Sequence, residues 1–189
     1  MRPNDRARWY ALYRSGLSPE ALPQWLADYP FEEVLVVFAH DLRHQVSFVI
    51  SWSHLWRDEV NWEHPQLDGA RDIRELLDRL ISEATVADDI ISEAMEYYED
   101  SMASEGDVPY EIEVDIVRGS LIIFDDMRDY TDTLRTINDQ LLKHPHLMDV
   151  TLDAGDKILH LDMLTDTVEE NTAMLHSILD VVRGYGECL

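Results

Sequence analysis

Apolar residues recur every three or four positions through most of the chain, the spacing of a helix that buries one face. Four long stretches show this spacing, at about 31–59, 69–103, 112–143 and 153–183. Two short helices are also predicted, at 5–14 and 19–28, and the second has Ser18 as N-cap and Pro19 at its first position. No stretch alternates polar and apolar residues convincingly as a strand would. The pattern predicts an all-α fold.

The breaks between these stretches indicate how the helices connect. Gly106 with Pro109 separates the second long helix from the third, and His144 with Pro145 separates the third from the fourth. Short breaks between long amphipathic helices favour antiparallel neighbours. We therefore predict an antiparallel four-helix bundle with left-handed, coiled-coil-like packing over residues 31–187, after a helical extension at 1–30. Its two hairpins span 31–103 and 112–184.

The two predicted hairpins are similar to each other at an offset of 85 residues. The apolar stripe of the first long helix is Leu35, Phe38, Leu42, Gln45, Val49, Trp52 and Trp56. The positions 85 residues later are Ser120, Ile123, Met127, Tyr130, Leu134, Ile137 and Leu141. The same offset places Asp-Leu-Arg at 41–43 over Asp-Met-Arg at 126–128. Either the chain contains two fused hairpins, or two amphipathic hairpins share a generic spacing.

Charge narrows the choice of partners. The 189 residues include 39 acidic and 15 basic side chains, for a formal net charge of −24, and Lys143 and Lys157 are the only lysines. Such a charge repels nucleic acid and anionic lipid, so neither is an expected partner. The acidity fits a partner with a basic face, or adaptation to high salt. Both explanations remain open.

Composition also bears on the cellular compartment. Cys188 is the single cysteine, which excludes a disulfide framework and a cysteine-based metal site. No apolar run is long enough for a membrane span, and the N-terminal residues do not lead into a signal core. We expect a cytoplasmic protein of one domain.

A short motif near the start of the first long helix carries the chemistry. Residues 38–46 read Phe-Ala-His-Asp-Leu-Arg-His-Gln-Val, with His40 followed directly by Asp41. This string resembles the phosphoacceptor box of two-component histidine kinases, whose helical hairpin dimerises into a four-helix bundle. The resemblance implies that His40 accepts a phosphoryl group and that the adjacent acid manages its proton. The resemblance covers about residues 31–100 and continues more weakly to residue 183.

The helical spacing assigns a role to each residue of the motif. With Leu35 and Phe38 facing the core, His40 and His44 point away from it. Asp41 could accept the Nδ1 hydrogen of His40 and leave Nε2 as the nucleophile. Arg43 could contact phosphate oxygens or a partner carboxylate, and His44 and Gln45 complete the predicted contact surface.

The motif departs from the family's commonest pattern, which has Thr or Asn where His44 stands and Pro where Gln45 stands. It matches another branch, His-Asp-x-x-x-Gln, in which the glutamine is associated with positioning water for dephosphorylation of the partner. The core pattern places Gln45 near the seam, which argues against that role here. The His-x-x-Lys-Gly pattern of monomeric histidine phosphotransfer domains is not reproduced.

The kinase's nucleotide module has no counterpart in the sequence. Neither a P-loop pattern nor the paired asparagines and glycine-rich boxes of the kinase ATP-binding domain occur. We therefore expect a histidine phosphotransferase that depends on an external donor, with a response-regulator receiver domain or a histidine kinase as partner. No cofactor is expected, and no metal, because the Glu-x-x-His pairs of bundle di-iron sites are missing.

The oligomeric state and the class of function both stay open. If the hairpins are fused repeats, Asp125 occupies the position equivalent to His40, and one chain forms a pseudo-dimer with one acceptor. The bundle could equally form a homodimer. The competing class of function is a non-catalytic acidic adaptor that docks a signalling partner through a degenerate box.

Overall fold

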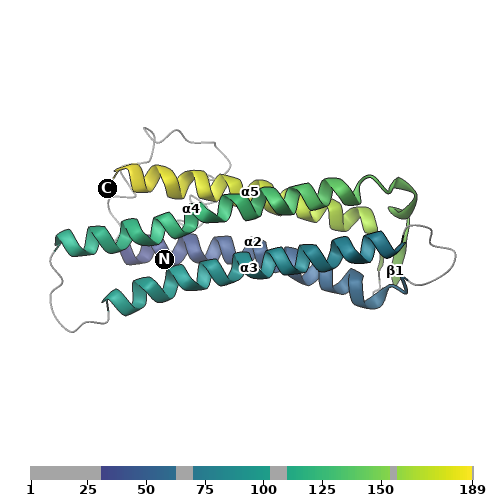
Figure 1. Cartoon of the computed structure of the whole chain (residues 1–189), viewed down its shortest axis with the longest axis horizontal. Helices are drawn as coiled ribbons and strands as arrows, with labels where there is room; N and C mark the ends of the chain where they lie inside the picture. The colour runs from purple at the N-terminus through teal and green to yellow at the C-terminus, as the bar shows by residue number, and fades with distance from the viewer. Residues whose placement is uncertain (1–30, 63–69, 103–109, 154–156, 189) are drawn as a thin grey trace. The chain divides into compact units, whose positions relative to one another are not determined.

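The chain forms long helices, as its apolar spacing predicts. The structure is a computed structural model that describes residues 31–62, 70–102, 110–153 and 157–188. The long helices within these ranges are α2 (Phe31–Glu59), α3 (Ala70–Met102), α4 (Tyr110–Leu141) and α5 (Leu161–Cys188) (Figure 1). The predicted all-α class is confirmed. The two short helices predicted at 5–14 and 19–28 lie outside the described residues.

The chain divides into two compact units, and each takes segments of all four helices. Unit 1 takes its described residues from Met1–His44, Asp89–Arg128 and Met174–Leu189. Unit 2 takes its described residues from Gln45–Asp88 and Asp129–Ala173. Each unit has its own apolar interior.

The core of unit 1 comes from one face of each helical segment. Its fully or almost fully buried side chains include Leu35, Phe38, Leu42, Ile91, Phe124, Met127, Leu175 and Ile178. At the surface of the unit, a hydrogen bond joins α4 to α5: Arg128 Nη2 donates to Asp180 Oδ1 over 2.9 Å. Burying these side chains supplies most of the free energy of folding, at about 25 cal/mol per Å² of apolar surface.

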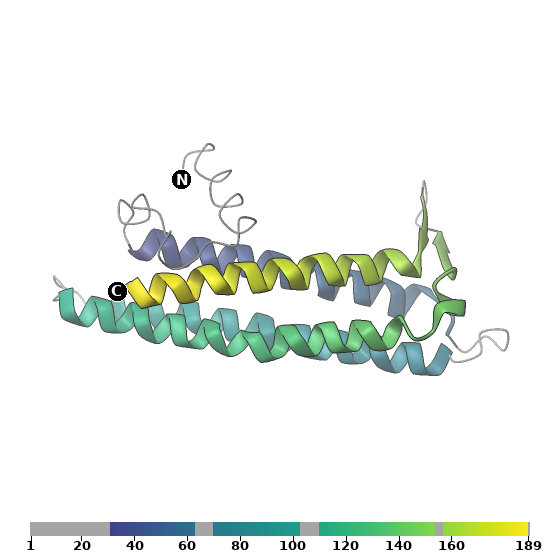
Figure 2. The ribbon, with the colours of Figure 1, turned by 90° about the horizontal axis from the view of Figure 1, so that it is seen from above.

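The core of unit 2 is built in the same way. Its buried side chains include Val49, Trp56, Ile73, Leu77, Leu80, Leu134, Ile137, Leu141, Leu164 and Val168. The ends of α2 and α4 and the starts of α3 and α5 lie together at one end of this unit, which we call the hairpin end (Figures 1 and 2). The stripe predicted for the first helix is buried at Trp56 and Val49 and half-buried at Gln45 and Trp52.

The helix α2 ends with a tryptophan cap. The last four carbonyls of a helix lack partners within it. Trp62 folds back from just beyond the helix, and its indole Nε1 donates to the carbonyl oxygen of Trp56 over 2.9 Å. Trp62 is itself buried, so one residue both satisfies a terminal carbonyl and extends the core of unit 2.

A proline stops α4. His144 N–H donates to the Leu141 carbonyl over 3.0 Å, and Pro145, which has no N–H, starts the short 3-10 helix η3 (Pro145–Leu147). Proline suits the first position of such a turn, where its missing donor is not needed. The break predicted at His144 and Pro145 is therefore present.

The connection from η3 to α5 differs from the prediction. A small antiparallel hairpin, β1 (Thr151–Asp153) and β2 (Ile158–His160), occupies positions that we expected to begin the fourth helix at about 153. Leu152 pairs with Leu159, and both are buried, while their neighbours are exposed. The prediction of no strand was wrong here because three residues of alternation are too few to compete with the helical period that follows.

Candidate functional site

His40 and Asp41 are neighbours on α2 but lie in opposite environments. The His40 side chain is 57% exposed, whereas the Asp41 side chain is 3% exposed. Helical spacing explains the difference. Asp41 lies three residues after buried Phe38 and seven after buried Val34, so it falls on the face that packs into unit 1. His40 lies four residues after exposed Val36, on the solvent face.

A hydrogen bond joins the two side chains. Nδ1 of His40 lies 3.2 Å from Oδ1 of Asp41. An ionised carboxylate can only accept, so the neutral ring carries its proton on Nδ1. The lone pair then resides on Nε2, the ring nitrogen that has no bond to Asp41. This is the tautomer that a nucleophilic histidine attacking through Nε2 requires.

Asp41 is unusual for its burial. Among the described residues it is the one charged side chain in the buried class, and the other buried polar residues are Ser, Thr and Asn. Burying a carboxylate is costly unless it is paired and hydrogen-bonded. Groups retained at such a cost are enriched at functional sites. Helical spacing with Phe38 and Val34 could have revealed the burial from the sequence.

The other predicted site residues follow along α2. His44 is exposed one turn beyond His40, and the two rings lie nearly parallel, with centroids 6.4 Å apart and 15° between their planes. Arg43 is exposed. Gln45 is half-buried and belongs to unit 2. Contacts thus join three of the five predicted residues, His40, Asp41 and His44.

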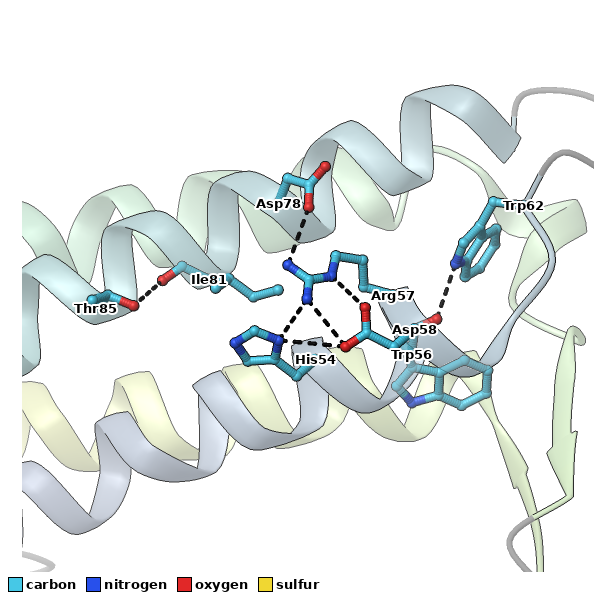
Figure 3. Close-up of polar contacts among 8 residues, drawn as sticks. All are labelled: His54, Trp56, Arg57, Asp58, Trp62, Asp78, Ile81 and Thr85. Carbon is cyan, nitrogen blue, oxygen red and sulfur yellow. Dashed lines mark hydrogen bonds and ion pairs between the residues drawn. The ribbon is translucent and has the colours of Figure 1, made fainter.

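A second histidine cluster, which was not predicted from the sequence, lies in unit 2 (Figure 3). Arg57 Nη2 donates to Nδ1 of His54 over 2.9 Å, and Arg57 Nε donates to Asp58 over 2.7 Å. Arg57 also reaches from α2 to Asp78 on α3, with 3.5 Å between Nη1 and Oδ1. The signal was present as His54 and Asp58 four residues apart with arginine between them.

The cluster gives His54 a different environment from that of His40. Nδ1 of His54 lies 2.9 Å from Arg57 Nη2 and 3.6 Å from Asp58 Oδ2, so a donor and an acceptor share one ring nitrogen. The side chain of His54 is 43% exposed, against 57% for His40. His54 is therefore a control for His40 that matches it in helix and in exposure but not in the neighbours of Nδ1.

Electrostatics in this cluster act mainly between Arg57 and Asp58. The hydrogen bond from Arg57 holds the pKa of Asp58 below its ordinary value of 3.8. The same bond to Asp58 raises the pKa of Arg57. Both groups therefore stay charged at neutral pH and hold the imidazole of His54 in place.

The described part of the chain contains neither a metal-binding cluster of three or more side chains nor a helix suited to a membrane. No group of three or more His, Cys, Asp or Glu side chains there is arranged to hold a metal ion. The rings of His144 and His146 lie 6.2 Å apart without a third such residue. Within the described residues, no helix combines the length and the apolar character that crossing a membrane requires.

Comparison of the chain with protein-family models, with curated proteins and with solved structures found no match.

Proposed function

We propose that this chain is a histidine phosphoacceptor of a two-component pathway and that it acts through His40. The observation that carries the proposal is the hydrogen bond between an exposed imidazole and a buried carboxylate. The His40 side chain is 57% exposed, and its Nδ1 lies 3.2 Å from the buried Asp41 carboxylate, which accepts a proton bound there. An exposed nucleophile with its base on the protein side suits a donor that arrives as another macromolecule.

The proposed reaction balances with these two residues. Nε2 of His40 attacks the phosphorus of an aspartyl phosphate on a receiver domain, the P–O bond to the aspartate breaks, and the receiver's carboxylate leaves. The new Nε2–P bond makes the ring cationic. Transfer of the Nδ1 proton to Asp41 restores a neutral phosphoimidazole and neutralises a buried charge. Reversal of the same steps returns the phosphoryl group to a receiver.

The neighbouring side chains support binding of an anionic group. Arg43 and His44 are exposed close to His40 on a chain of net charge −24. Arginine pairs well with phosphate oxygens, and His44 lies within 6.4 Å of the accepting ring, measured between centroids. In the proposed reaction, Arg43 and His44 would donate hydrogen bonds to the transferring phosphoryl group. The phosphoryl donor must be another protein, either a receiver domain or a kinase.

The test is transfer from receiver domains loaded with acetyl phosphate, followed as acid-labile phosphate on the chain. Wild type and His54→Gln are expected to accept phosphate equally, and His40→Gln to accept none. His40→Gln should still fold, since substitution of an exposed residue changes the free energy of unfolding by about 0.5 kcal/mol or less. Equal uptake by His40→Gln and wild type would refute the assignment. Partner binding without uptake by wild type would favour the adaptor function.

A further inference from the structure

His40 and His44 form a pair of imidazoles on successive turns of α2, and both belong to unit 1. Residues four apart in a helix are neighbours on its surface. The two rings lie nearly parallel, with 15° between their planes and 6.4 Å between their centroids. Both residues are exposed, so a small ion can reach the pair from solvent. Two histidines with this spacing hold zinc on one helix face in many metalloenzymes.

The pair has a second feature of metal sites, which is a carboxylate behind one ring. A histidine that binds a metal through one ring nitrogen commonly donates its other N–H to a carboxylate, which orients the ring and makes the ligating nitrogen a better donor. Nδ1 of His40 lies 3.2 Å from Oδ1 of Asp41, whose side chain is 3% exposed. This contact turns Nδ1 toward the protein and assigns Nε2 as the coordinating atom of His40.

The histidine cluster of unit 2 shows what sets this pair apart. His54 and Asp58 are also four residues apart on α2 and could share an ion by spacing alone. Arg57 Nη2 already lies between them, 2.9 Å from Nδ1 of His54 and 3.1 Å from Oδ2 of Asp58. A guanidinium thus takes the place of a metal ion there, as Figure 3 shows. His54 is therefore a suitable control for metal binding as well.

We propose that His40 and His44 bind a divalent transition-metal ion of the kind that imidazole favours, such as Zn²⁺. Each imidazole replaces one water of the hydrated ion, and water keeps the remaining positions. A ligating nitrogen lies about 2.0–2.1 Å from zinc, so the two nitrogens must come within about 3–4 Å of each other. Rotation of the exposed His44 ring, whose terminal torsion is soft, is the movement that this requires while His40 keeps its bond to Asp41.

Two protein ligands make this an exchangeable site. Structural and catalytic zinc sites use three or four protein ligands. The described residues contain no group of three or more His, Cys, Asp or Glu placed to hold an ion. Arg43 is exposed three residues after His40 and adds a positive charge that opposes a cation. The ion therefore binds more weakly than a resident cofactor, and its affinity depends strongly on each of the two imidazoles.

Metal binding has a consequence for phosphoryl transfer, and this consequence rests on the proposed function. The lone pair on Nε2 of His40 cannot bind zinc and attack phosphorus at the same time. A bound ion therefore blocks phosphoryl uptake, and a phosphorylated His40 cannot bind the ion. The site would couple the phosphorylation state of the chain to the concentration of free transition metal.

Competition with a chromophoric chelator measures the affinity of the full-length chain for Zn²⁺. Wild type and His54→Gln are expected to bind with equal affinity, whereas His40→Gln and His44→Gln each bind at least about tenfold more weakly. Mg²⁺ should not compete, because it prefers oxygen ligands. Circular dichroism checks that every variant is folded. Unchanged affinity in either His40→Gln or His44→Gln overturns the proposal, and so does an equal loss in His54→Gln.

Phosphoryl uptake from phosphoramidate, with and without Zn²⁺, separates the metal site from the proposed function. At a Zn²⁺ concentration about ten times its Kd, uptake by wild type should fall about tenfold. In His44→Gln the ratio of uptake with and without Zn²⁺ should stay near one, whatever its own rate. Zinc binding that needs both histidines, without uptake by wild type, would refute the proposed function and support the metal site. Uptake at His40 that Zn²⁺ does not slow would refute the metal site alone.

Discussion

At the scale of single residues, the proposed function depends on which nitrogen of His40 carries the proton. Asp41 accepts from Nδ1 of His40, whereas Nδ1 of His54 lies 2.9 Å from Arg57 and 3.6 Å from Asp58. The two imidazoles on the same helix thus differ in the neighbours of Nδ1. The outward direction of His40 followed from the apolar spacing of α2. Charge and exposure alone do not distinguish His40 from His54, whereas the partner of Nδ1 does.

The carboxylate of Asp41 leads to a prediction about rate. Asp41→Asn keeps the size of the side chain but removes the charged acceptor of the Nδ1 proton. The nucleophile remains, so phosphoryl uptake by His40 is expected to slow by about 10²-fold or more without vanishing. Single-turnover transfer from a phosphorylated receiver measures this, with the melting temperature as the check on folding. An unchanged rate in a folded Asp41→Asn would show that Asp41 has no part in the reaction.

The contact between Arg57 and Asp58 leads to a prediction about pH. Because the pKa of Asp58 is lowered from 3.8, its ion pair stabilises the fold above pH 3.8, and the contribution is lost as the pH falls through the lowered value. Asp58→Asn should therefore reduce stability slightly at neutral pH, since the pair is exposed. Urea titrations of wild type and Asp58→Asn measure the difference between their free energies of unfolding. This difference should be smaller at the lowest pH where the chain stays folded than at neutral pH. The same difference at both pH values would contradict the prediction.

At the scale of helices and strands, the apolar period predicted much of the structure and missed one connection. The described helices α2, α3 and α4 start and end within a few residues of the predicted positions. Long amphipathic helices are predictable because each turn repeats the same signal. The hairpin between η3 and α5 was missed because its register depends on one buried pair, Leu152 and Leu159, that is visible only after the chain folds.

In the candidate site too, the sequence predicted some features and missed others. The exposure of His40 agrees with the direction predicted from helical spacing, and its contact with Asp41 agrees with the predicted pairing. The roles of the two residues in phosphoryl transfer stay predictions. The burial of Asp41 was not predicted, although its spacing from Phe38 places it on the buried face of α2. The cluster around Arg57 was missed because its link to Asp78 joins two helices, and spacing within one helix does not show it.

The proposed internal repeat stays a prediction. Leu42 and Met127 are both buried, as are Val49 and Leu134, which is the pattern that an offset of 85 residues requires. The helix ends fit less well, because the same offset from the start of α3 at Ala70 leads to Gly155, whereas α5 begins at Leu161. The Asp125 side chain, predicted to correspond to His40, lies outside the described side chains.

Truncation of one buried and one exposed side chain tests the assigned helix faces. Leu164 on α5 is fully buried, and Leu164→Ala is expected to lower the free energy of unfolding by about 2–5 kcal/mol. Ile122 on α4 is 65% exposed, so Ile122→Ala should change it by about 0.5 kcal/mol or less. Denaturant titration of both variants measures the two values. Similar losses for the two variants would show that one of these faces is assigned wrongly.

At the scale of the whole molecule, the dominant electrostatic feature is the net charge of −24. Charge of one sign opposes the approach of like-charged molecules and favours the approach of basic surfaces. Arg43 places a positive charge next to His40 and His44 on α2. If a receiver domain is the partner, as we propose, the overall charge would influence how fast it associates, and Arg43 would act at the contact itself.

The most direct measurement is chemical phosphorylation of the full-length chain with phosphoramidate, which needs no partner protein. In this reaction a histidine nitrogen attacks phosphorus and ammonia leaves. The site is then located by mass spectrometry and by 31P NMR on protein labelled with 15N at histidine. We predict that His40 reacts fastest, with phosphorus bonded to Nε2, and that His54 reacts much more slowly. Equal labelling of His40 and His54, or phosphorus on Nδ1 of His40, would contradict the proposed function.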